Sequence, residues 1–328
     1  MMSYLPRRLL HTTLPHLSSS TTKPHTAQEA CSELLTRFST SPISTRHQIL
    51  DANQLHLLQT TLTRTPTSYT HPKPGTPIPP GYHLVYFTPS ILESELGRDG
   101  TDRTVNPLAP FTRRMWAGGE LEWNERKDSG LKVGQEVQET TRLVSAEAKT
   151  MKNGGEMLVV GVEKEFENEF GVAVKDGRNW VFQREFDIAE AKPPLERPAT
   201  KPFPGAEGEG VGRRDFTQTA VSLFRFSALT FNAHKIHFSR EWCREVEGHR
   251  DAVVHGPLNL INMLDLWRDT VRDGAEDAVP KSIAYRAMSP LYMGEQYRIL
   301  LNREGEGKWK AEIWDGFGKL GMRGSIVG

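Results

Sequence analysis

The chain has 328 residues, 37% of them hydrophobic, and its 41 basic residues balance its 41 acidic residues. That length allows one large or two medium domains of an ordinary globular protein. The balanced charge argues against nucleic acid or an anionic membrane as the main partner, because both usually select a basic excess. No apolar run reaches the ~18 residues that a membrane-spanning helix needs. The two cysteines, Cys31 and Cys243, indicate free thiols in a reducing compartment.

The first 28 residues differ in composition from the rest of the chain. They contain no acidic residue, and Arg7 and Arg8 lie within a short leucine-rich stretch. This composition is typical of a mitochondrial transit peptide, so the sequence predicts one over residues 1–28 and places the protein in the matrix. A disordered tail is the alternative interpretation of the same segment.

Two proline-rich segments divide the remainder. A helix is predicted to begin after Asp51, which suits an N-cap, with Gln54 placed to complete a capping box. A connector over 66–81 follows, and a second breaker near 192–212 combines prolines and glycines without periodicity. We therefore predict an N-terminal domain over 50–190, a linker over 191–212 and a C-terminal domain over 213–328.

The two predicted domains resemble each other. In each, an alternating strand leads to a glycine turn, at Gly134 or Gly294, and a second alternating strand returns. Further strand-like runs follow in both, over 157–166, 179–186, 308–314 and 319–327. This pattern predicts a duplicated antiparallel sheet unit.

One long helix is predicted over 256–273. Its apolar residues fall almost all round the helix, so it should be buried on most sides, as when a sheet wraps around it. At the corresponding place the first half has only residues 115–119, which are too few for such a helix. The sequence therefore predicts an α+β fold of antiparallel sheets around a long central helix that only the C-terminal unit keeps.

The candidate catalytic residues lie in two short segments. Asn232, His234 and His237 fall within one irregular stretch, and His255 and Gly256 immediately precede the long helix. A positioned imidazole can move a proton near neutral pH. Free N–H groups at a helix start can hold a developing oxyanion. Together they suit chemistry at the carbon next to a thioester carbonyl.

Other interpretations of these residues remain open. His234 either orients its loop or faces solvent, and the side chain of His255 packs or caps the helix. A three-histidine metal site is disfavoured because no carboxylate or cysteine accompanies the histidines at ligand spacing, so we predict no metal. Arg113 and Arg114 either meet a phosphate of the substrate's carrier or lie on a solvated face.

Four motifs follow one another at 94–100 (SELGRDG), 113–119 (RRMWAGG), 225–237 (RFSALTFNAHKIH) and 254–258 (VHGPL). Their order resembles that of the MaoC-like hydratases and dehydratases of the hot-dog fold. The likeness covers residues 50–328 and is greatest to the two-domain type with a FAS1-like dehydratase domain, as in mitochondrial 3-hydroxyacyl-thioester dehydratase type 2 and mesaconyl-C4-CoA hydratase. It implies a double hot-dog with a C-terminal MaoC-like catalytic domain.

The resemblance also implies site roles. The wider family has Asp-x-Asn-Pro-aliphatic-His in its active-site loop, and here Asn232 stands at the Asp position while His237 keeps the His. An amide cannot accept a proton as a carboxylate does, so His237 should carry most of the proton transfer, helped by His234. Gly256 would supply the oxyanion-binding N–H.

The implied function is reversible dehydration of 3-hydroxyacyl thioesters to trans-2-enoyl thioesters, making the chain a hydro-lyase. A mitochondrial address favours 3-hydroxyacyl-ACP of type II fatty acid synthesis. The alternatives are a mesaconyl-C4-CoA-type hydratase of short branched dicarboxylic CoA esters, or a non-catalytic thioester-binding protein. No cofactor is expected beyond the carrier, ACP or CoA, and a homodimer is left open.

Overall fold

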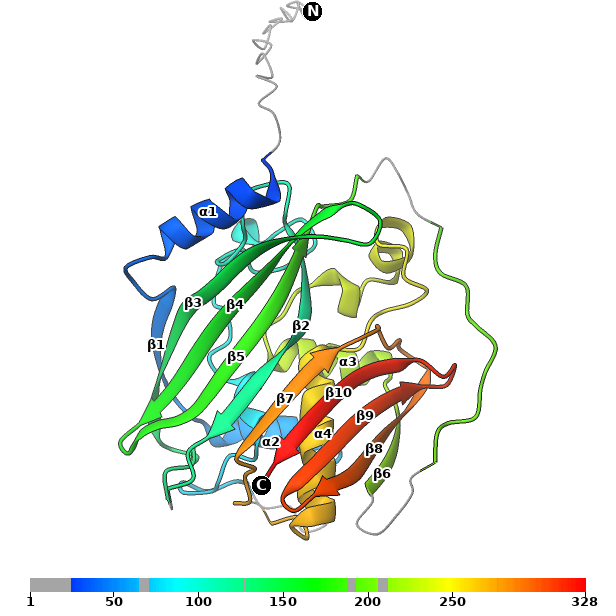
Figure 1. Ribbon diagram of the computed structural model, residues 1–328. Coiled ribbons are helices and arrows are strands. Elements are labelled where there is room, and N and C mark those ends of the chain that lie inside the picture. Colours follow the sequence, from blue (N-terminus) through cyan, green and yellow to red (C-terminus); the bar gives the residue numbers. More distant parts are fainter. Residues whose placement is uncertain (1–24, 65–70, 127, 188–192, 206–211, 276) are drawn as a thin grey trace, which may run out of the picture.

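The computed structural model describes residues 25–64, 71–126, 128–187, 193–205, 212–275 and 277–328. One antiparallel sheet of ten strands runs through the molecule in the order β1-β3-β4-β5-β2-β7-β10-β9-β8-β6 (Figure 1). We call residues 25–187 the first unit and residues 212–328 the second unit. The two units meet in the middle of the sheet, where β2 pairs with β7 from Gly118 to Glu122.

The strands of the first unit are longer than those of the second. The first unit holds β1 (Ser44–Ile49), β2 (Arg113–Trp123), β3 (Glu136–Thr150), β4 (Glu156–Asn168) and β5 (Gly171–Gln183). The second holds β6 (Gly212–Thr217), β7 (Ser282–Ala287), β8 (Gln296–Gly305), β9 (Lys308–Asp315) and β10 (Leu320–Val327). The predicted strand runs fall on β4, β5, β9 and β10. Gly134 and Gly294 lie in turns, with left-handed φ angles of +88° and +75°. The hairpins predicted around them are wrong, because β2 and β3 are not neighbours in the sheet and neither are β7 and β8.

A single long helix fills the second unit, as predicted. Helix α4 (Gly256–Val271) lies against the sheet of β6–β10 in Figure 1, and eleven of its sixteen residues are buried. Leu258, Ile261 and Leu264 are at most 1% exposed, so they belong to the core. Helix α3 (Ala220–Leu229) and the short helices η3 (Lys235–His237) and η4 (Trp242–Val246) precede it.

The first unit has no helix like α4 among its described residues. Helix α1 (Ala27–Arg37) packs near one end of β3 and β4, and α2 (Ala52–Thr61), η1 (Tyr82–Val85) and η2 (Glu93–Glu95) are short. Along one face of β4, Leu158, Val160 and Val162 pack with the buried residues of α1 in one hydrophobic cluster. Lys164, on the same face, lines a cavity instead. Residues 115–119 are part of strand β2, with a bulge between Trp116 and Gly118.

One local prediction needs correction. Asp51 caps α2 by accepting from Gln54 N at 2.8 Å, but the Gln54 side chain donates to Val85 O and Leu229 O instead of closing a capping box. This amide therefore connects α2 to both units, and tertiary contacts prevail over the local motif.

The transit peptide predicted over residues 1–28 stays a prediction, and its last residues overlap helix α1. Residues 1–24 lie outside the described residues, but Thr26 and Glu29 form the capping box of α1, and Ala27 is 2% exposed. Cleavage after residue 28 would remove this cap, so any processing that leaves α1 intact occurs before Thr26. In the predicted linker, the described residues 193–205 form no helix or strand. None of the helices in the described ranges is long and apolar enough to cross a membrane.

Candidate active site

A cavity of about 1370 Å³ is lined by residues from both units. The second unit contributes the loop after α3, helix η3 and the start of α4, and the first unit contributes β2, β4, β5 and the segment before β2. Every candidate site residue of the sequence lies on its wall: Asn232, His234, His237, His255 and Gly256.

His237 is held in one tautomer. Its Nδ1 lies 2.8 Å from the carbonyl oxygen of Val253. Because a carbonyl oxygen can only accept, Nδ1 carries the proton and Nε2 keeps its lone pair. Burial lowers the pKa of His237 to about 4, so the imidazole is neutral at physiological pH. This is the state that a general base requires.

The ring of His255 packs against the ring of His237. The two rings stack with centroids 3.7 Å apart and an angle of 18° between their planes. His255 Nε2 lies 2.9 Å from the hydroxyl oxygen of Ser227, and its side chain makes no cap hydrogen bond to α4. Of the two interpretations of His255, packing is therefore observed and capping is not. Ser227 was missed because it is 28 residues distant from His255 and no motif links them.

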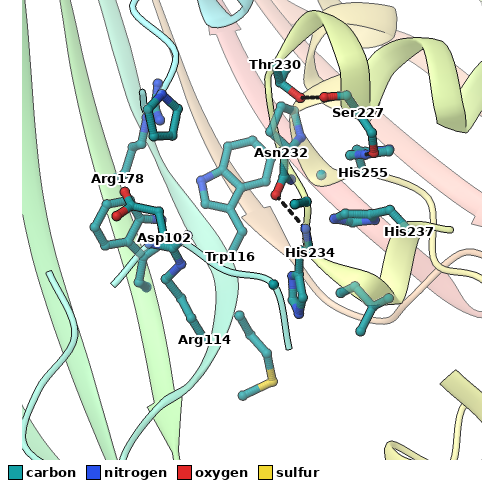
Figure 2. A pocket seen from close by; sticks show the side chains of 18 of the residues that line it. Asp102, Arg114, Trp116, Arg178, Ser227, Thr230, Asn232, His234, His237 and His255 are labelled. Atoms are coloured by element: carbon teal, nitrogen blue, oxygen red, sulfur yellow. Dashed lines mark hydrogen bonds between the residues drawn. The ribbon is translucent and has the colours of Figure 1, made fainter. Parts of the chain in front are cut away.

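Asn232 and His234 shape the same loop (Figure 2). The side-chain oxygen of Asn232 accepts from His234 N at 3.1 Å, which leaves its amide N–H groups without an acceptor among the described residues. His234 is 8% exposed, so the expectation that it faces solvent is wrong. Its Nε2 lies 3.7 Å from a carboxylate oxygen of Asp99 in the first unit. Burial nevertheless lowers the pKa of His234 well below its ordinary value, with further lowering by His237 and Arg114.

Gly256 is a glycine for a reason that the sequence did not show. A Cβ on this residue would lie 2.0 Å from the ring of Trp116, which β2 of the first unit places against the start of α4. No hydrogen bond among the described residues uses the Gly256 N–H. Pro257, next in α4, has no N–H at all. The Gly256 N–H is therefore a free donor on the cavity wall, at the positive end of a buried helix and next to an indole ring.

The two arginines of the 113–119 motif differ in environment. Arg113 donates to Glu247 at 3.1 Å and to Gln183 at 2.6 Å. Both line the cavity, and the guanidinium of Arg114 lies over the ring of Trp180. Neither lies on a solvated face. Within the described ranges, no group of three or more His, Cys, Asp or Glu side chains is placed to hold a metal ion.

The amino-acid sequence is similar to those of known enzymes. The model of the family hydroxyacyl-thioester dehydratase type 2 matches residues 81–293, more than half of the chain. Mesaconyl-C(4)-CoA hydratase of Chloroflexus aurantiacus is 28% identical over 237 residues, which cover 72% of this chain and 78% of that protein. The mitochondrial hydroxyacyl-thioester dehydratase type 2 of Schizosaccharomyces pombe is 24% identical over 250 residues, covering 70% and 79% respectively.

Solved structures share the fold. A MaoC-like dehydratase from Phytophthora capsici has a TM-score of 0.60 and 16% identity, covering 89% of this chain and 98% of its own. A Mycobacterium tuberculosis protein described as a double hotdog fold has a TM-score of 0.52 and 13% identity, covering 88% and 97%. The fold is therefore the α+β double hot-dog that the sequence predicts.

Proposed function

The chain belongs to the hydroxyacyl-thioester dehydratase type 2 family, and from that premise we propose that it interconverts 3-hydroxyacyl thioesters and trans-2-enoyl thioesters by losing or adding water. One observation carries this proposal. A neutral histidine with a free Nε2 and an unused helix N-terminal N–H line the same cavity. Water addition to an enoyl thioester needs a base for water and a donor for the oxygen that becomes enolate-like.

The proposed steps follow from these positions. In hydration, His237 Nε2 removes a proton from water as the water oxygen bonds to Cβ, and the double-bond electrons shift toward the thioester carbonyl. Gly256 N–H donates to that carbonyl oxygen, and the dipole of α4 favours its negative charge. The imidazolium of His237 then returns the proton to Cα. Dehydration is the reverse sequence.

Asn232 is proposed to position the reacting oxygen. Its amide N–H groups are free to donate to the water or to the 3-hydroxyl, while its side-chain oxygen holds the loop. An amide neither takes nor gives up a proton at these pH values. The proton therefore moves through His237, with no metal or cofactor needed beyond the group that carries the acyl chain.

Crotonyl-CoA turnover tests the proposal. The purified protein should remove the absorbance of the enoyl thioester and form 3-hydroxybutyryl-CoA, detected by mass. Thioester cleavage with release of free CoA would contradict the assignment. Binding of crotonyl-CoA without turnover would favour the non-catalytic thioester-binding protein instead.

The carrier and the location are further proposals. The relative from Schizosaccharomyces pombe is named mitochondrial, which supports a mitochondrial matrix location and ACP of type II fatty acid synthesis as the carrier. A reporter fused to residues 1–25 should enter mitochondria, and a panel of acyl-ACP, acyl-CoA and mesaconyl-CoA ranks the carriers. The size of the protein in solution, measured by light scattering, tests whether it forms a homodimer.

A further inference from the structure

Asn259 is a buried residue of α4 to which the proposed reaction gives no role. It is 6% exposed and lines the cavity from the second unit. Its side-chain oxygen has no hydrogen-bond partner among the described residues, and no hydrogen bond among those residues uses its side-chain nitrogen. Burying an amide without hydrogen bonds lowers stability, so a ligand that pairs with this amide would be bound favourably.

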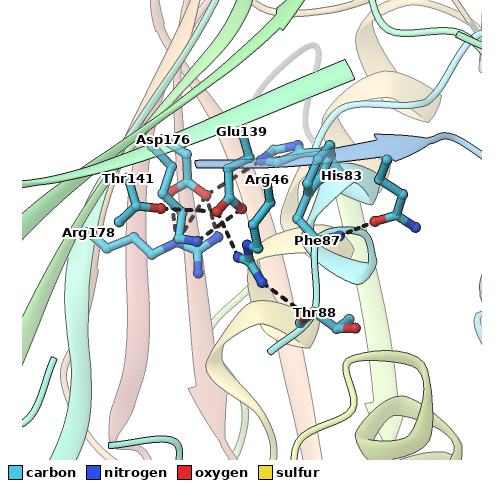
Figure 3. Close-up of polar contacts among 10 residues, drawn as sticks. Arg46, His83, Phe87, Thr88, Glu139, Thr141, Asp176 and Arg178 are labelled. Carbon is cyan, nitrogen blue, oxygen red and sulfur yellow. Dashed lines mark hydrogen bonds and ion pairs between the residues drawn. The ribbon is translucent and has the colours of Figure 1, made fainter. Parts of the chain in front are cut away.

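Buried polar side chains on the first unit's wall of the same cavity differ, because they pair with one another (Figure 3). Arg46 donates to a carboxylate oxygen of Glu139 at 2.7 Å, and the hydroxyl of Thr141 donates to the same oxygen at 3.0 Å. These groups satisfy each other within the fold. Asn259 has no such partner among the described residues, so packing alone does not explain why α4 carries an amide there.

The place of Asn259 in α4 puts its amide beside the Gly256 N–H. Gly256 is the first residue of α4, and Asn259 follows it on the next turn. Residues three apart on an α-helix share a face and lie ~5–6 Å from each other. Helical side chains also tilt toward the start of their helix. The Asn259 amide therefore reaches back toward the first turn, where the unused N–H of Gly256 lines the same cavity.

The Asn259 side chain can present a donor at this place. Because neither end of the amide is hydrogen-bonded within the described residues, it is free to turn so that an N–H faces the cavity. Backbone N–H groups and asparagine side chains both act as donors in oxyanion holes, and they act most strongly where water is excluded. The neighbouring Pro257 has no N–H, so it cannot supply a second backbone donor next to Gly256.

We propose that Asn259 is a second oxyanion donor, whose side-chain N–H binds the thioester oxygen together with the N–H of Gly256. The two donors stabilise the negative charge that this oxygen gains as water adds to the double bond. They act on the same atom whatever the acyl chain or its carrier. This inference rests on the proposed dehydratase function and deepens it, because it assigns a further catalytic residue to the step that forms the enolate-like oxygen.

Asn259→Leu tests the second donor, because it removes the amide while nearly keeping the volume of the side chain. It should lower kcat on crotonyl-CoA by about 10²-fold with little change in KM, since an oxyanion donor acts mainly as charge develops. Its urea midpoint should equal or exceed that of the wild type, because an unpaired polar group is removed and no hydrogen bond within the described residues is lost. Asn259→Ala, which leaves room for a water molecule as a substitute donor, should lower kcat less.

Asn262→Leu is the matched control, because Asn262 is the other buried asparagine of α4 and lies outside the described cavity wall. The folded control protein should keep the wild-type kcat. Near wild-type kcat in both Asn259 variants would overturn the second donor while leaving the dehydratase function intact. A higher KM at unchanged kcat, or an equal loss of kcat in Asn262→Leu, would overturn it as well. No turnover of crotonyl-CoA by the wild-type protein would overturn both proposals.

Discussion

The two units share an antiparallel sheet but fill its interior differently. In the second unit, α4 covers the sheet with apolar residues, including Leu260 and Trp267 at 0% exposure. In the first unit, the corresponding space is a cavity whose wall includes Arg46, Glu139 and Lys164. The comparison suggests a division of labour. A tightly packed unit holds the groups that must be positioned for proton transfer, and an open unit leaves room for the acyl chain.

The units depend on each other at their contact. Trp116 of the first unit lies against Gly256 of the second, and Asp99 of the first approaches His234 of the second. Lys235 N also donates to the Asp99 backbone oxygen at 2.7 Å. The catalytic loop is therefore held by both units, and neither unit alone would form the site.

The largest effect is expected in the second unit. His237→Ala should lower kcat on crotonyl-CoA by ~10²-fold or more, because a positioned general base contributes at least that much. Asn232→Ala should cost less, since the amide only orients the reacting oxygen. Circular dichroism checks that both variants fold. Near wild-type turnover by the folded His237→Ala protein would remove His237 from the mechanism.

A smaller effect is expected at the contact between the units. Gly256→Ala places a Cβ 2.0 Å from the Trp116 ring, so either the indole or the start of α4 must move. We expect a loss of ~1–3 kcal/mol in unfolding free energy and at least a tenfold loss of kcat/KM. Gly305→Ala in β8 is the control, because a Cβ there meets nothing within 4 Å. Equal behaviour of the two variants would show that the contact with Trp116 does not matter.

Asp99 tests whether the first unit assists the catalytic loop. Asp99→Asn keeps the oxygen that accepts from Thr101 N but removes the charge 3.7 Å from His234. Kinetics on crotonyl-CoA should show about a fivefold lower kcat, equivalent to the ~1 kcal/mol of a single polar contact with the neutral His234 ring. Asp215→Asn, which breaks a distant pair with Arg298, should leave kcat unchanged. If both variants behave alike, Asp99 has no part in the reaction.

As the pH falls, the histidines of the second unit should lower the free energy of unfolding before the carboxylates of the first unit do. The pKa of His237 is about 4 when folded and ~6.5 when unfolded. The unfolded chain therefore binds the proton first as the pH falls, so stability is complete above ~6.5 and decreases toward 4, by ~3 kcal/mol for this residue. The lowered pKa values of Glu139 and Asp176 act only at lower pH. Urea titrations should show a weaker pH dependence over this interval in His237→Ala, and an equal dependence would contradict the assignment.

The sequence predicted what depends on local pattern. The all-round apolar pattern over 256–273 predicted the buried helix, which ends at Val271. The glycines at 134 and 294 predicted turns, but not which strands pair across them. The residues singled out between Asn232 and His237 all lie on the cavity. Pairings between distant segments could not be predicted. The Ser227–His255 contact, the Trp116 ring over Gly256 and the place of Arg114 over Trp180 all depend on how distant segments pack, which no spacing in one sequence reveals.

A crystal structure of His237→Ala with a bound enoyl thioester tests the division of labour most directly. We expect the thioester oxygen within ~3 Å of Gly256 N, the length of an N–H···O hydrogen bond. The acyl chain should pass Trp116 into the first unit. A thioester oxygen bound elsewhere, or an acyl chain that enters the second unit alongside α4, would contradict the account.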